Sequence, residues 1–128
     1  MSTVINGTTG INKVDISAFN SEGNAPQYIC RSWVNFQGTD TVTIRESGNV
    51  SSITDNGIGN YTVNFITDMP DSNYIVIAWI NRALDTYNLL DSLEAISYTN
   101  TSFILRTGYY ASGVANIDMA KVDVAVFR

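Results

Sequence analysis

Residues 49–65 read NVSSITDNGIGNYTVNF and constrain the fold of this chain more than any other stretch. In the second half, Tyr61, Val63 and Phe65 alternate with polar residues, which is the period of a strand with one buried face. Between the two halves, residues 55–59 contain an Asn-Gly pair and a second glycine, which accept positive φ and allow the chain to reverse. The stretch predicts a β-hairpin with a loop of more than two residues.

Further alternating segments with turn residues between them predict more strands at residues 28–36, 41–47, 73–80, 93–100, 101–109 and 119–127. Residues 109–117 contain glycine and alanine and are expected to form a loop. At 128 residues the chain has the length of one domain. We predict an all-β fold, an antiparallel two-sheet sandwich of jelly-roll-like form over residues 28–128. Residues 1–27 have isolated apolar residues and several glycines, and are expected to form an extended N-terminal arm with one short strand at 13–19.

The strand at residues 73–80 reads NYIVIAWI and is apolar on both faces. One face of a sandwich strand meets the core, so the other face, with Ile75, Ile77 and Trp79, needs a second cover. We predict that these three residues form an oligomer interface. The arm and the segment at residues 81–92, which has the texture of a helical turn or an ordered loop, are the alternative covers.

Charge and composition exclude several functions. The chain has 7 basic and 12 acidic residues and no basic stripe, so neither nucleic acid nor an anionic membrane surface is an expected partner. It contains no histidine, the commonest general base and metal ligand, and a single cysteine, Cys30, which we expect to be buried and unreactive. We therefore predict no cofactor and no metal. No apolar run approaches the ~20 residues of a membrane span, and no leader is evident, so synthesis in the cytoplasm is expected.

Two groups of side chains are candidates for a site. The acidic residues of predicted turns would have to supply the paired carboxylates of a glycan hydrolase, but nothing pairs them and turns favour Asp for local hydrogen bonds. We predict that the protein is not an enzyme, with a hydrolase as the alternative. These acidic residues are Asp55, Asp68, Asp71, Asp85 and Asp91. The other group comprises Tyr87, Tyr109 and Tyr110, whose rings, among small polar residues, predict a ligand-binding surface; rings that cap the core are the alternative.

Residues 30–65 read CRSWVNFQGTDTVTIRESGNVSSITDNGIGNYTVNF. This string resembles a domain that recurs in tail fibres and other virion proteins of tailed bacteriophages. That domain carries a C-R-A-W-V-N-F stretch, followed by G-N-V-S-S-I-T-D-N-G and G-x-Y-T-V-N-F. The chain departs from the pattern at Ser32, where alanine is usual, and residues 81–118 do not match it.

The resemblance implies a non-enzymatic structural or adhesive virion protein, commonly a homotrimer, whose partners are other virion proteins and a host surface glycan or receptor. It leaves two positions on the particle open. The first is a surface appendage or tail-fibre tip for host attachment. The second is a capsid decoration (cement) protein that its N-terminal arm anchors to the shell. In both cases the N-terminal arm is the expected anchor to the particle or to a sister subunit. Residues 81–118, which do not match the pattern, would carry specificity if the domain binds a receptor.

Overall fold

A computed structural model describes residues 29–81, 90–110 and 114–128 of the chain. In this part of the chain, the regular elements are all β-strands: β1 (Cys30–Gln37), β2 (Thr43–Gly48), β3 (Val50–Asp55), β4 (Asn60–Phe65), β5 (Ile75–Asn81), β6 (Leu90–Ile96), β7 (Ser102–Tyr110), β8 (Val114–Asn116) and β9 (Lys121–Phe127).

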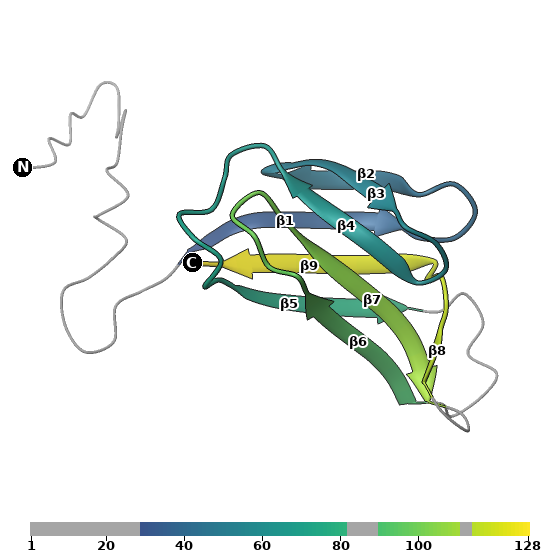
Figure 1. Cartoon of the computed structure of the whole chain (residues 1–128). Helices are drawn as coiled ribbons and strands as arrows, with labels where there is room; N and C mark the ends of the chain where they lie inside the picture. The colour runs from purple at the N-terminus through teal and green to yellow at the C-terminus, as the bar shows by residue number, and fades with distance from the viewer. Residues whose placement is uncertain (1–28, 82–89, 111–113) are drawn as a thin grey trace, which may run out of the picture.

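The strands form two antiparallel sheets that pack face to face (Figure 1). One sheet has the order β2-β1-β9-β5, and the other has the order β3-β4-β7-β6, with β8 continuing beside β7 beyond the start of β4. The first and last strands, β1 and β9, are therefore neighbours. The predicted all-β sandwich is confirmed.

Alternation along the strands fills the space between the sheets. The inward side chains of β1, β4, β7 and β9 are almost completely buried, and Phe36 and Tyr61 meet edge to face at a centroid distance of 5.2 Å. Each large apolar side chain moved out of water contributes about 1.5–3 kcal/mol to folding. The inward residues of these four strands are Ser32, Val34, Phe36, Tyr61, Val63, Phe65, Phe103, Leu105, Thr107, Val122, Val124 and Val126.

The predicted hairpin is present as β3 and β4, paired from Val50 opposite Phe65 to Asp55 opposite Tyr61. Its loop uses both glycines at positive φ, 113° for Gly57 and 60° for Gly59. The Gly59 amide donates to Asp118 Oδ1 at 2.7 Å, and the same oxygen accepts from the Tyr61 hydroxyl at 2.7 Å. One carboxylate therefore joins the hairpin loop to the segment that leads into β9.

Four local predictions were wrong. The strand predicted at residues 93–100 lies earlier in the chain, as β6 (Leu90–Ile96). Residues 109–117 are not simply a loop, because Tyr109 and Tyr110 end β7 and β8 pairs with them. Asp91 belongs to β6 and not to a turn. Cys30 is exposed, because the pairing of β1 with β9 shifts register between Cys30 and Ser32 and takes Cys30 out of the inward alternation. The arm and residues 82–89 lie outside the described residues.

The carboxyl-terminal residue is held against the loop between β4 and β5. Arg128 donates from Nε and Nη2 to the two carboxylate oxygens of Asp71, at 2.9 and 2.6 Å. The Asn73 amide donates to the same carboxylate at 2.8 Å. These bonds, with that from Arg128 the strongest, favour the charged form and lower the pKa of Asp71 from 3.8 to about 2.

This clamp predicts a pH dependence of stability. The pKa of Asp71 is lower in the folded state, so its contribution is complete above about pH 4 and is lost as the pH falls towards 2. We expect Asp71→Asn to be less stable than the wild type by a constant amount near neutral pH, and the difference to vanish near pH 2. Urea unfolding of both proteins across this range measures it. A difference that persisted undiminished at pH 2 would contradict the assignment.

Candidate functional site: an exposed apolar sheet face

One half of the outer face of the sheet β2-β1-β9-β5 is apolar. This is the half that contains the start of β1, the end of β9 and the start of β5. Strand register places its side chains in rows that run across the sheet. Ile75 lies opposite Phe127 on β9, and Ile77 lies opposite Ala125, which in turn lies opposite Trp33 on β1. Trp79 begins the next row. We call this surface the apolar face; its residues are Trp33, Ile75, Ile77, Trp79, Ala125 and Phe127.

The apolar face follows from alternation on an edge strand. In β5, Val76, Ala78 and Ile80 turn towards the core, which leaves the other three apolar residues outside. Ile75, Ile77 and Trp79 are 66%, 60% and 72% exposed, and Trp33 on β1 is 43% exposed. Among the described residues, β5 pairs on one side only, with β9. An apolar, uncharged edge strand of this kind is prone to association.

A shallow hollow of about 310 Å³ lies on the apolar face. Trp33 and Trp79 belong to its lining, with Ile77 and Ala125 between them, and Asn35 and Asp123 line its polar end. The hollow exists because Ala125 on the central strand is small, while the neighbouring strands carry large side chains in the same row. Trp33 also covers Gly48 on β2, where an added Cβ would lie 2.4 Å from the indole Nε1.

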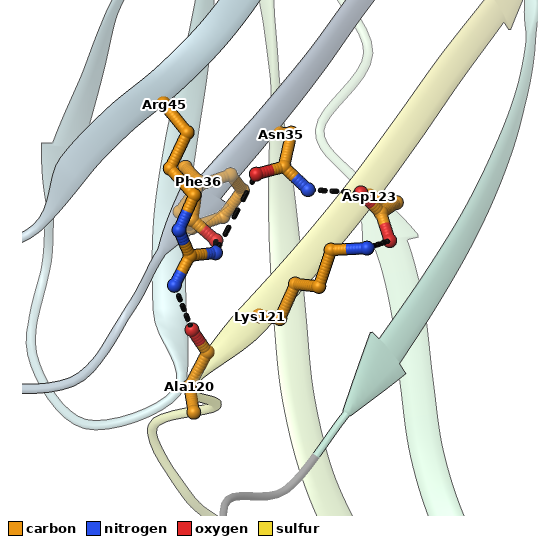
Figure 2. A network of polar contacts seen from close by, with 6 residues as sticks. All are labelled: Asn35, Phe36, Arg45, Ala120, Lys121 and Asp123. Atoms are coloured by element: carbon orange, nitrogen blue, oxygen red, sulfur yellow. Dashed lines mark hydrogen bonds and ion pairs between the residues drawn. The ribbon is translucent and has the colours of Figure 1, made fainter.

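A network of polar side chains borders the apolar face, at the end away from the start of β1 (Figure 2). Asp123 accepts from the side-chain amide of Asn35 and pairs with Lys121 Nζ at 2.9 Å. Arg45 donates to the carbonyl oxygen of Ala120 at 2.8 Å, and also to Phe36 O and to Asn35 Oδ1.

Asp123 stays charged within this network. Partial burial raises the pKa of its carboxyl, but the hydrogen bonds from Lys121 and Asn35 outweigh that effect, so the net shift is downward. Trp79 lies directly opposite Asp123 in the register, so the ring stands at the border between the apolar and the charged part of the surface. The network therefore fixes where the apolar face ends.

The apolar face lies at the upper end of the apolar patch sizes found on monomeric proteins. The exposed parts of Trp33, Ile75, Ile77 and Trp79 amount to roughly 500–600 Å², close to the largest apolar patch of a typical monomer. A standard protein interface takes about 800 Å² from each partner. The other exposed large apolar residues in the described ranges are Ile58, Ile66 and Tyr98, each in a loop. The apolar face is therefore the strongest candidate for a functional surface.

The two predicted sites, the oligomer interface and the tyrosine surface, have different outcomes in the structure. It brings Ile75, Ile77 and Trp79 onto one surface with Trp33, Ala125 and Phe127, which the sequence-based prediction missed. Alternation separates Trp33 from Ser32, Val34 and Phe36 on its strand, but only the register with β9 shows which strands are neighbours. Of the tyrosines, Tyr109 is half-buried in β7, Tyr110 ends that strand, and Tyr87 lies outside the described residues. Their role in ligand binding remains a prediction.

The predicted turn acids behave individually where the structure describes them. Asp55 accepts from the Gly57 amide at 2.8 Å, and Asp71 binds Arg128 and the Asn73 amide. Asp68 lies exposed in the β4–β5 loop, and Asp85 is outside the described residues.

Within residues 29–81, 90–110 and 114–128, no group of three or more His, Cys, Asp or Glu is placed to hold a metal ion. The same residues contain no helix with the length and hydropathy of a membrane span.

The fold and the apolar face identify this protein as a β-sandwich with an exposed apolar sheet face. They do not identify a narrower class. Comparison of the chain with known protein families, with curated proteins and with solved structures finds no match.

Proposed function

We propose that this chain is a non-enzymatic structural protein of a tailed-phage virion, a surface appendage for host attachment that assembles as a homotrimer through the apolar face. The observation that carries the assembly is the exposure of Ile75, Ile77 and Trp79 on β5, an edge strand that among the described residues pairs only with β9. The assignment to a virion is supported by the sequence motifs of residues 30–65, which resemble a domain of phage tail fibres.

Residues of the motif hold structural positions in the fold. Asn49 has φ of 58° where the chain crosses from β2 to β3. Its side-chain amide donates to the carbonyl oxygens of Arg31 and Thr67, at 3.2 and 3.0 Å, and its Oδ1 accepts from the Thr67 amide at 2.7 Å. The G-N-V-S-S part of the motif thus connects the two sheets, which supports a structural role for the motif rather than a catalytic one.

The mass of the purified full chain, measured by light scattering, tests the assembly. We expect about three times the mass of one chain. Ile77→Asp places a carboxylate at the centre of the apolar face and should give a folded monomer, because an unpaired buried charge costs several kcal/mol. Ile58→Asp is the matched control: Ile58 is 67% exposed in the β3–β4 loop, and its variant should keep the wild-type mass. A monomeric wild type, or equal masses for both variants, would contradict the proposal.

Binding of the purified protein to host cells and to capsids tests where on the virion the protein is located. An attachment protein should bind cells of the bacterial host and should not bind purified capsids. Binding to capsids, with a gain in their resistance to heat, would instead favour the capsid decoration protein and overturn the attachment role.

A further inference from the structure

We propose that the N-terminal arm (residues 1–27) of one copy lies across the apolar face of the next copy, with Val14 and Ile16 in the hollow between Trp33 and Trp79. This inference rests on the proposed homotrimer and names the contact that builds it. The partner is a second copy of this chain, and the segment that docks is one that precedes the described residues.

Symmetry gives the first argument. A surface that binds its own counterpart around a two-fold axis produces a dimer, whereas a closed ring of three needs two different surfaces that fit each other. The described residues provide one large exposed apolar surface, the apolar face. The outer face of the other sheet carries hydroxyl and amide side chains that bind one another, such as Asn64 with Ser52 and Thr54, each at 3.1 Å. The second surface of a trimer must therefore come from another part of the chain.

Shape gives the second argument. Three sheets that face a three-fold axis enclose a triangular space, so neighbours touch near the sheet edges and the middle of each face stays apart from the others. The hollow lies in that middle region, above Ala125 on β9. Sheets alone would leave the hollow and the two indole rings uncovered. A single extended strand with small apolar side chains has the width to fill such a groove.

The arm has the sequence and the position for this contact. Residues 13–19 read KVDISAF; if they form an extended strand, the two-residue period puts Val14 and Ile16 on one side and Lys13 and Asp15 on the other. The arm joins the domain at β1, whose first residue, Cys30, lies opposite Phe127 at the edge of the apolar face. In Figure 1 this is the end of the sandwich where β9 ends and β5 begins.

Length allows the arm to reach a neighbour. The ten residues between Phe19 and Cys30 span up to about 35 Å when extended. A folded domain of about 100 residues has a radius of gyration near 13 Å, so a neighbouring face lies within this reach. An arm that folded onto the face of its own domain would cover the surface without joining copies, and the trimer would lose its contact.

Tryptophan fluorescence is a direct probe because the chain has two tryptophans and both lie on the apolar face. We expect the full chain to emit at short wavelength and to resist acrylamide. Deletion of residues 2–20 should give a folded monomer, since the core lies within β1 to β9, with red-shifted emission and several-fold stronger quenching. The double variant Val14→Asp/Ile16→Asp should behave like the deletion. Val4→Asp/Ile5→Asp, the same change outside the docking strand, should behave like the wild type.

A mixing experiment tests whether the arm crosses between copies. The Ile77→Asp variant keeps its arm but has a damaged face, and the arm deletion keeps its face but has no arm. Each alone should be a monomer, and together they should form a mixed complex in which the tryptophans of the deletion protein become protected. Failure to form this complex, while the full chain is a trimer, would overturn the inference.

The outcomes separate the two proposals. A trimer that survives the arm deletion with protected tryptophans overturns the exchanged arm and leaves the proposed homotrimer standing. A full chain that is a monomer or a dimer overturns the homotrimer and the exchanged arm together. A monomer whose tryptophans become exposed on arm deletion would show that the arm covers its own face.

Discussion

Replacement of Tyr61 by alanine is expected to lower the free energy of unfolding by about 3–5 kcal/mol, the cost of removing a large ring from a packed core. Tyr61 is completely buried in β4, packs edge to face on Phe36 and closely approaches Gly38. Its hydroxyl donates to Asp118 Oδ1 at 2.7 Å, and burial together with this carboxylate raises the pKa of the phenol. The variant therefore loses both packing and the bond that holds the start of β9.

Tyr61→Phe separates these two losses, because it keeps the ring and removes the hydroxyl. We expect it to cost about 1–2 kcal/mol, since Asp118 retains its bond from the Gly59 amide. Both variants should be unfolded in urea at one fixed chain concentration and followed by circular dichroism, because the stability of an oligomer depends on concentration. Equal losses for the two variants would mean that the hydroxyl, and not the ring, dominates.

Substitution of Gly59 by alanine is expected to cost about 3 kcal/mol or more. Gly59 has φ of 60°, and a Cβ there would lie 2.3 Å from the carbonyl oxygen of Thr107 and 2.7 Å from the amide nitrogen of Ile117. Both atoms belong to the backbone, so neither moves aside as a side chain would. The loop is also tied at this point, because the Gly59 carbonyl accepts from the Thr107 amide at 2.9 Å.

Gly57→Ala is the matched control within the same loop. Gly57 also has positive φ, 113°, but an added Cβ would meet nothing within 4 Å. This variant should lose about 1–2 kcal/mol from backbone strain alone. Urea unfolding of the two variants measures the difference, and similar losses at both positions would refute the steric explanation for Gly59.

The two glycines look alike in the sequence, and this comparison shows where prediction from sequence reaches its limit. Asn56-Gly57 and Gly59 predicted a hairpin loop, and the loop is present. The close approach of β7 and the β8–β9 connection to Gly59 is a tertiary fact, because Thr107 and Ile117 are distant in the chain. In the same way, Cys30 fits the inward alternation of its strand, and only the register shift against β9 turns it outward.

The all-β class and the apolar character of both sides of β5 could be predicted from the sequence, since both follow from the two-residue period of a strand and from local turn chemistry. Three features required the folded structure: the outer side of β5 shares a surface with Trp33, the small side chain of Ala125 leaves a hollow there, and Asp123 lies at its border. These relations depend on which strands are neighbours and in what register they pair, and long-range pairing is not encoded in the period of any single strand.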